Sequence, residues 1–169
     1  VSFFDKGIPV LATSSTCTFT LRDEYPHLLE VDNTGLREHI ELATRFLWRK
    51  LDSGQTLPLG KLPLKVVYHT PCHMEKMGWS IYTLELLRLI PGLELTVLDS
   101  RCCGIAGTYG FKRENYPTSQ AIGAPLFRQI EESGADIVVT DCETCKWQIE
   151  MSTSKRCEHP ITLLAKALA

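Results

Sequence analysis

Five cysteines fall into three short groups, and their types and spacing are the features of this sequence that most clearly indicate chemistry. The groups are Thr70-Pro71-Cys72-His73, Arg101-Cys102-Cys103-Gly104 and Thr140-Asp141-Cys142-Glu143-Thr144-Cys145. Each group directly follows an apolar run that is typical of a buried strand. Because ligands collect where parallel strands end at the carboxyl edge of a sheet, thiolates from distant parts of the chain should meet there. The pattern predicts a metal-binding site.

The adjacent pair Cys102 and Cys103 favours a polynuclear metal centre over a single ion. Neighbouring side chains diverge, so two adjacent thiolates reach different metal atoms more easily than one small tetrahedral ion. Glycines at 104, 107 and 110 allow unusual backbone angles and a close approach to a bulky inorganic centre. Five thiolates also exceed the four ligands of a structural zinc site, which commonly uses two CxxC pairs where this chain has one.

Composition sets the broad class of the protein. The chain has 169 residues, 44% of them hydrophobic, and a formal net charge of -2 with both signs interspersed. It carries no basic block of the kind that nucleic-acid binding requires, and no apolar run long enough to span a bilayer. Seven cysteines without a secretion signal indicate a reducing compartment, where clustered thiols bind metals or do redox chemistry. The first residues read as the middle of something longer.

Strand and helix patterns alternate along the chain, which predicts an α/β fold. We expect a mainly parallel sheet flanked by helices, with the metal site at the carboxyl ends of the strands. The expected strands are residues 8–13, 64–70, 93–98 and 136–140. The expected helices are residues 36–51, 79–90, 117–133, 146–151 and 160–167. Pro125 should kink or divide the third of these helices.

One internal repeat appears when Cys17 is laid on Cys145. Residues 11–21 then match residues 139–149, and both copies run from a strand through a Thr-Cys pair into a helix. Ser14 stands where the second copy has Cys142. We expect the segment around Cys17 to lie away from the five-cysteine site. The repeat also divides the chain into three parts. Residues 1–30 are the tail of a preceding related cysteine-rich module, residues 31–63 an amphipathic helix and linker, and residues 64–169 the cysteine-rich domain.

The spacing of the three groups resembles the cysteine-rich CCG domain of heterodisulfide reductase B subunits and their relatives. The flanking stretches His69-Thr70-Pro71-Cys72-His73 and Cys145-Lys146-Trp147 widen the match. The resemblance covers residues 64–169 as a full module and residues 8–30 as the end of a preceding one. It implies a [4Fe–4S] cluster, which in relatives can be non-cubane. The residues that it implies as cluster and metal ligands are Cys72, Cys102, Cys103, Cys142 and Cys145.

The same resemblance implies a role in electron transfer. The chain would be a non-catalytic iron–sulfur module of an anaerobic respiratory dehydrogenase. Its expected partners are flavoprotein dehydrogenase subunits, which supply electrons, and a membrane component linked to quinone, which receives them. Its expected place is the cytoplasm, peripheral at the cytoplasmic face of the inner membrane.

Residue reasoning alone leaves two other functions open. The first is a structural zinc-binding docking domain without a redox role, and the second is a thiol–disulfide oxidoreductase that uses Cys142 and Cys145 as a dithiol. In an isolated fragment the cluster can also be absent or replaced by zinc. We interpret Cys17 as a buried inert thiol and place Cys157 outside every group. His69 and His73 are expected to form hydrogen bonds or to pack in the core.

Overall fold

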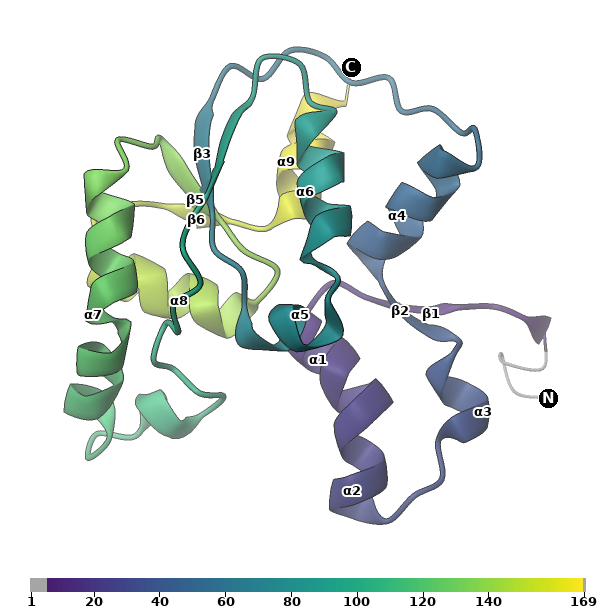
Figure 1. The fold of residues 1–169 in the computed structure, drawn as a ribbon, viewed down its shortest axis with the longest axis horizontal. Coiled ribbons are helices and arrows are strands. Elements are labelled where there is room, and N and C mark those ends of the chain that lie inside the picture. Colours follow the sequence, from purple (N-terminus) through teal and green to yellow (C-terminus); the bar gives the residue numbers. More distant parts are fainter. Residues whose placement is uncertain (1–5, 169) are drawn as a thin grey trace.

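The computed structural model describes residues 6–168 and contains two parallel β-sheets with helices around them (Figure 1). The larger sheet has the strand order β4–β3–β5–β6, and the smaller sheet pairs β1 with β2. Every strand pairing in both sheets is parallel. The strands are β1 (Val10–Ala12), β2 (Ile40–Leu42), β3 (Lys65–Tyr68), β4 (Glu94–Val97), β5 (Ile137–Val139) and β6 (Cys157–Glu158). The expected α/β fold with a parallel sheet is confirmed.

Helices connect the strands and cover the larger sheet. The α-helices are α1 (Ser15–Phe19), α2 (Tyr25–Leu29), α3 (Thr34–Arg37), α4 (Ala43–Asp52), α5 (Cys72–Met77), α6 (Ser80–Arg88), α7 (Tyr116–Glu132), α8 (Glu143–Ser152) and α9 (Pro160–Ala167). A π-helical turn, Thr20–Glu24, joins α1 to α2, and a short 3-10 helix, Tyr109–Phe111, precedes α7. Within the described residues, no helix is long and apolar enough to cross a membrane.

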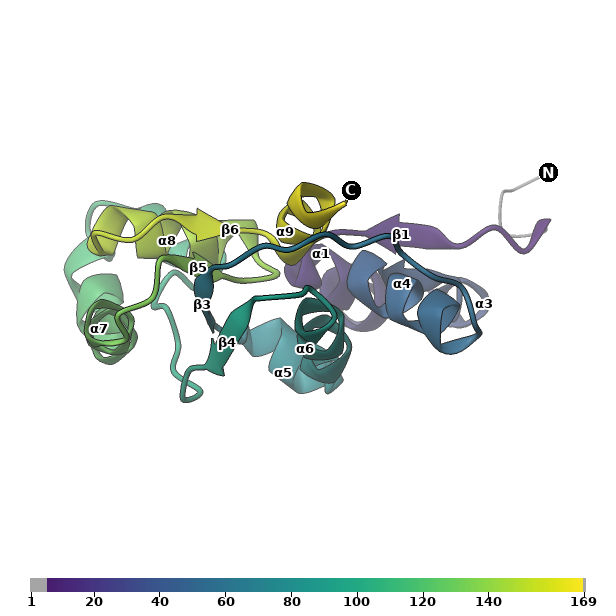
Figure 2. The same cartoon turned by 90° about the horizontal axis from the view of Figure 1, so that it is seen from above.

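Two apolar cores lie on opposite faces of the larger sheet, because side chains alternate along a strand. Val66 and Tyr68 pack with buried residues of α6 and α9. The intervening Val67 packs instead with residues of α7 and α8, together with Val138 of β5. Figure 1 shows α7 and α8 on one side of the strands and α6 and α9 on the other, and Figure 2 shows the same arrangement from above.

The helix expected over residues 36–51 is wrong in its first half. Residues 40–42 form β2, which pairs in parallel with β1, and the helix α4 begins only at Ala43. Ile40 and Leu42 are both buried. Residues two positions apart point to the same side of a strand, so these two apolar side chains also fit a strand that buries one face. Pairing with a distant strand therefore outweighs the local helical periodicity.

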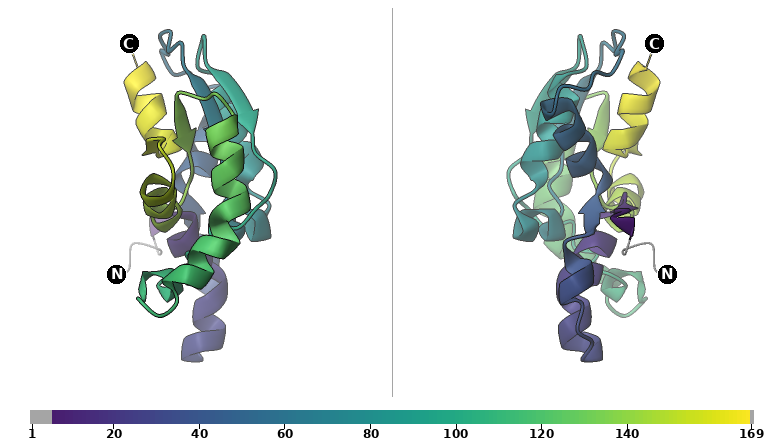
Figure 3. Two further views of the ribbon diagram at one scale, coloured as in Figure 1. Left: turned by 90° about the vertical axis from the view of Figure 1, so that its left-hand side faces the viewer. Right: turned by 90° about the vertical axis from the view of Figure 1, so that its right-hand side faces the viewer.

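Two further differences concern elements near the expected cysteine site. Pro125 lies inside α7, which is one helix of 17 residues, so the expected division is absent and the kink stays a prediction. Figure 3 shows α7, in green, as one continuous coil. The sequence also did not indicate β6 or α5. The strand β6 consists of two residues, which is too short for a recognisable pattern, and it pairs with the outer edge of β5. The remaining expected strands and helices are present within a few residues of their expected bounds.

The carboxyl end of β5 is held by the buried carboxylate of Asp141. The hydroxyl of Tyr68 donates to its Oδ2 at 2.6 Å, and the hydroxyl of Thr83 donates to its Oδ1 at 3.0 Å. The backbone oxygen of Asp141 accepts the amide of Ser15 at 2.8 Å. Burial raises the pKa of the carboxyl to about 6. Asp141 thus joins β3, α6 and α1 at the residue before Cys142.

Cys157 gives a pH-dependent test of the core. Its thiol is buried on β6, and burial raises its pKa from 9.0 to about 12. Between these values the unfolded chain binds fewer protons than the folded chain, so stability falls as the pH rises through that window. Cys157→Ala should be less stable than the wild type at neutral pH, because it leaves a cavity, but should lose less stability on going to strongly alkaline pH. Urea unfolding of both proteins across that range measures this, and parallel losses would contradict the explanation.

Candidate metal centre

The three cysteine groups follow β3, β4 and β5, which lie side by side in the larger sheet (Figure 1). Two of the loops lead directly into helices, since Cys72 is the first residue of α5 and Cys142 is the N-cap residue of α8. The structure brings all five cysteines to the same cavity, whose volume is about 630 Å³. The expected convergence at one edge of the sheet is therefore present. That these cysteines act as ligands stays a prediction.

Each of the five thiols contacts at least one of the others. The sulfur atoms of Cys103 and Cys145 lie 3.1 Å apart. Cys72 shares a hydrogen bond with Cys102, and Cys142 shares one with Cys145. Cys103, Cys142 and Cys145 are buried, whereas Cys72 and Cys102 are exposed. The site thus has a closed interior and an open mouth.

These contacts divide the thiols into those that keep their protons and those that lose them readily. Hydrogen bonds from Cys103 and Cys72 lower the pKa of Cys102, and the hydrogen bond from Cys145 lowers the pKa of Cys142 to about 5. The hydrogen bond with Cys102 raises the pKa of Cys103 to about 12, and the pKa values of Cys72 and Cys145 are raised in the same way. Several adjacent thiolates repel one another, so the metal-free chain stabilises its charges with shared protons. A bound metal would displace those protons.

The loop after β4 depends on glycine at one position. Gly104 has φ +86°, and a Cβ atom there would lie 2.0 Å from the backbone oxygen of Ser119 in α7. The Ser119 hydroxyl donates to the backbone oxygen of Gly104 at 2.8 Å, and it accepts the amide of Gln148 in α8 at 2.9 Å. This contact between loop and helices fixes the turn that follows Cys102 and Cys103.

The sequence analysis expected the segment around Cys17 to lie away from the site, and this expectation is wrong. The segment does form the predicted strand and helix, β1 and α1, but Thr16, Thr20 and Glu24 line the cavity beside the cysteines. Cys17 itself is exposed and is absent from the cavity lining, so its interpretation as a buried thiol is wrong. The site is therefore built from the N-terminal segment, Thr16 to Glu24, together with the cysteine-rich domain.

Two threonines that the sequence analysis did not single out contact the sulfur of Cys142. The hydroxyl of Thr144 lies 3.2 Å from it and that of Thr16 lies 3.5 Å from it. The hydroxyl of Thr16 also contacts Nδ1 of His73 at 3.1 Å, and the His73 ring stacks on Phe19. The internal repeat aligns Thr16 with Thr144, so the sequence pairs these two threonines. It did not indicate that both hydroxyls contact the sulfur of Cys142.

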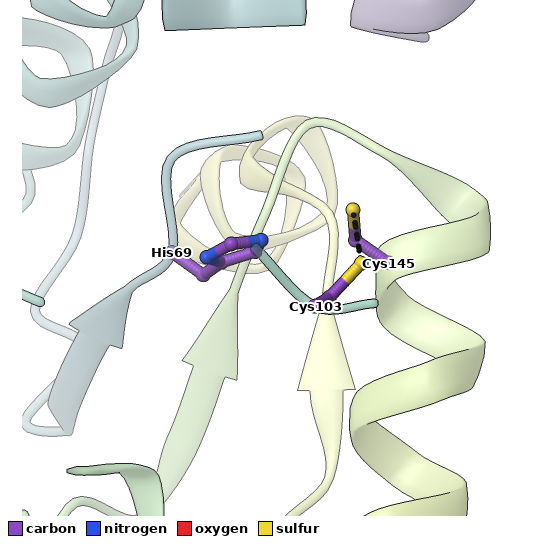
Figure 4. A group of neighbouring side chains, drawn as sticks. All are labelled: His69, Cys103 and Cys145. Carbon is purple, nitrogen blue, oxygen red and sulfur yellow. Dashed lines mark hydrogen bonds between the residues drawn. The ribbon is translucent and has the colours of Figure 1, made fainter. Parts of the chain in front are cut away.

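His69 is a further member of the site that the sequence did not identify. Its side chain is 1% exposed, and its Nε2 atom has no hydrogen-bond partner among residues 6–168. A ring nitrogen of His69 and the sulfurs of Cys103 and Cys145 all lie within 4.8 Å of one another, at the end of β3 (Figure 4). Burial lowers the pKa of His69 to about 4, so the ring is neutral at physiological pH. His69 therefore lies next to two of the buried thiols of the site, those of Cys103 and Cys145.

The contact at Gly104 can be tested by a pair of alanine substitutions in one loop. Gly104 and Gly107 both have positive φ, but only Gly104 has backbone atoms in the path of a Cβ atom, whereas Gly107 has nothing within 4 Å. Gly107→Ala should cost about 1–2 kcal/mol through backbone strain alone. Gly104→Ala should destabilise the fold by clearly more, because the loop must move away from α7. Denaturant unfolding of both variants measures the difference, and equal costs would show that the contact with Ser119 is unimportant.

Comparison with known proteins identifies relatives that match between 56% and 97% of the chain. It is 88% identical over 164 residues to a protein of Escherichia coli (strain K12) that is named as a subunit of anaerobic glycerol-3-phosphate dehydrogenase, covering 97% of this chain and 41% of that protein. It is 32% identical over 155 residues to lactate utilization protein A of Bacillus subtilis (strain 168), covering 84% of this chain and 62% of that protein. An uncharacterized iron-sulfur protein of Methanocaldococcus jannaschii is 33% identical over 96 residues, which are 56% of this chain and 19% of that protein.

The chain thus spans about two fifths of the length of the glycerol-3-phosphate dehydrogenase subunits that it matches. A family model is matched by residues 66–150, the part that contains β3, β4, β5 and all five cysteines of the cavity. That family is described as the CCG cysteine-rich domain, which agrees with the resemblance seen in the cysteine spacing. The chain belongs to the CCG family of cysteine-rich domains.

Proposed function

We propose that this chain is an iron–sulfur electron-transfer module of an anaerobic respiratory dehydrogenase. The observation that carries the proposal is the convergence of thiols from three strand ends on one cavity. The high identity to a protein named for anaerobic glycerol-3-phosphate dehydrogenase supports the choice of complex. The relative named as an iron-sulfur protein supports the choice of metal. The cluster ligands would be Cys72, Cys102, Cys103, Cys142 and Cys145.

The chemistry of this set of donors fits a [4Fe–4S] cluster, in a cubane or a non-cubane form. Thiolates select soft metals and iron–sulfur clusters, and five of them exceed what a single tetrahedral ion can use. The glycine loop at Gly104 brings backbone close to the cavity, and the buried Nε2 of His69 has no partner within the described chain. An unpaired buried polar atom that faces a group of thiols is expected where a bound group supplies its partner.

The protein would hold this cluster and control what surrounds it. When bound, the cluster takes up and passes on single electrons. The buried Cys103, Cys142 and Cys145 keep water from the inner part of the site, and the exposed Cys72 and Cys102 lie at its mouth. The mouth is where a redox partner can come close. We infer that flavoprotein glycerol-3-phosphate dehydrogenase subunits supply the electrons and that a membrane component linked to quinone accepts them, at the cytoplasmic face of the inner membrane.

We also propose that residues 1–30 are the tail of a preceding module related to the domain at residues 64–169. The topology supports this relation and extends it through the linker region, to the end of α4. The segments β1–α1–β2–α4 and β5–α8–β6–α9 both run from a strand through helix to a parallel neighbouring strand and then to a second helix. In each copy the first strand leads into the Thr-Cys pair that the repeat identified.

The two alternative functions agree less well with the site. A thiol–disulfide oxidoreductase needs an accessible thiolate, yet Cys142 and Cys145 are 4% and 6% exposed. A zinc docking domain needs four ligands and would leave one thiol of this set unused. Neither alternative requires bound sulfide, whereas an iron–sulfur cluster contains it. One experiment that measures bound metal and sulfide therefore separates all three functions.

The test is reconstitution of the chain with iron and sulfide under anaerobic conditions. We expect bound iron, acid-labile sulfide and visible absorption in the wild type, and a severe loss of all three in Cys72→Ser and Cys102→Ser. Both residues are exposed, so the metal-free variants should unfold at nearly the wild-type temperature. Cys17→Ser is the matched control, because Cys17 is also exposed but lies outside the cavity. It should retain the full cluster content.

Three results would contradict the proposal. Zinc bound without sulfide would favour the docking domain. A reversible Cys142–Cys145 disulfide without metal would favour the oxidoreductase. Equal loss of iron in Cys17→Ser and Cys102→Ser would show that the iron is bound outside the cavity.

A further inference from the structure

One buried polar atom beside the cysteine site, Nε2 of His69, has no partner among the described residues, and the proposed function does not say which atom of a cluster would supply one. The His69 ring comes from the end of β3, three residues before Cys72, and faces the sulfurs of Cys103 and Cys145 (Figure 4). We propose that His69 donates an N–H hydrogen bond from Nε2 to a sulfur atom of the bound cluster on the side held by Cys145. This inference rests on the proposed function.

The first argument is energetic. A polar atom that is buried without a partner destabilises the fold, so native proteins rarely keep one without a reason. The side chain of His69 is 1% exposed, and its Nε2 has no partner among the described residues. A nitrogen of its ring lies within 4.8 Å of the sulfurs of Cys103 and Cys145, which would hold a cluster. The missing partner is therefore expected to be part of the bound group.

The second argument comes from the hydrogen bonds of the other cysteines. Cys102 Sγ accepts the amide of Gly104 at 3.3 Å, and Cys103 accepts the amide of Ile105. Cys142 Sγ has the hydroxyls of two threonines within reach. By contrast, the hydrogen bonds of Cys145 Sγ among the described residues run to other cysteines. His69 stands where the cluster environment otherwise lacks a donor.

A donor role is preferred over metal ligation for two reasons. Five thiolates already supply the ligands that the resemblance to the CCG domain requires. In addition, a histidine that binds a metal through one nitrogen usually donates the other N–H to a carboxylate, a carbonyl oxygen or water. No such contact of the His69 ring with another described residue is present. His69 accordingly changes the reduction potential of the cluster through a hydrogen bond and does not bind the iron.

The expected effect is on the reduction potential. Reduction adds negative charge to the cluster, and a hydrogen bond to its sulfur stabilises the reduced form more than the oxidised form. His69→Phe keeps the aromatic ring and removes the donor, so it should shift the potential to more negative values while iron and sulfide content stay at the wild-type level. His69→Gln keeps an N–H donor and should restore much of the shift.

The experiment is a potentiometric titration of the anaerobically reconstituted chain, followed by its visible and electron paramagnetic resonance spectra. His27→Phe is the control, because His27 is exposed on α2 outside the cysteine cavity and should leave the potential unchanged. A second measurement needs no cluster. In the metal-free chain, His69→Phe should raise the thermal unfolding midpoint, since it removes a buried polar atom without a partner.

Several outcomes would overturn the inference. A loaded His69→Phe protein with the wild-type potential would reject the hydrogen bond and leave the proposed function intact. Loss of iron from both His69→Phe and His69→Gln would show ligation and not donation. A lower unfolding midpoint of metal-free His69→Phe would mean that the imidazole has a stabilising role inside the chain. A wild type that binds no sulfide would overturn the proposed function and this inference together.

Discussion

The buried carboxylate of Asp141 is the constraint on which the geometry of the site depends. An ionised carboxylate inside a protein is tolerated only when it is hydrogen-bonded, so the hydroxyls of Tyr68 and Thr83 must stay in place around it. Thr83 also hydrogen-bonds the hydroxyl of Thr44 in α4 at 2.9 Å. The hydrogen bonds of Asp141 therefore link β3 and β5 with α6, and Thr83 extends the network to α4. Because Cys142 is the residue after Asp141, the same contacts determine where the third cysteine group begins.

The rest of the site brings together groups that tend to move apart. Thiols in contact repel one another once they ionise, and burial makes each charge less favourable. The loop of Cys102 and Cys103 is nevertheless fixed, since the Gly104 carbonyl is bound to Ser119 and Ser119 is bound to Gln148. The scaffold, and not attraction among the thiols, holds the donors close. Such preorganisation reduces the cost of assembling a cluster at this edge of the sheet.

The sequence predicted the parts of the site that depend on local pattern. Each cysteine group follows a short β-branched run, and parallel strands must end at the same edge, so the convergence of Cys72, Cys103 and Cys142 could be inferred without coordinates. The strand β2 could not be, because its residues also fit a helical face and only the pairing with β1 decides between them. Local periodicity carries no information about a partner strand thirty positions away.

The inner surface of the cavity was predictable only in part. The contacts of Thr16 depend on how α1 packs against α5, and the repeat alone suggested the opposite, a segment remote from the site. Of the two roles expected for His69, a hydrogen bond or a place in the core, its burial agrees with the second. Its missing partner becomes visible only when the positions of the surrounding donors and acceptors are known. Long-range packing and hydrogen-bond satisfaction are properties of the assembled structure, and a linear pattern does not encode them directly.

The wall that α1 contributes has a consequence for how such proteins can change during evolution. Thr16 and Glu24 face the same cavity as Cys72 and Cys142, although they lie on the far side of the linker at residues 31–63. A gene rearrangement that joined residues 64–169 to an unrelated upstream segment would keep all five cysteines of the cavity and still leave one side of the cavity open to solvent. The two segments are therefore expected to be inherited as one unit, with exchange between homologues tolerated only where both sides of the cavity come from the same parent.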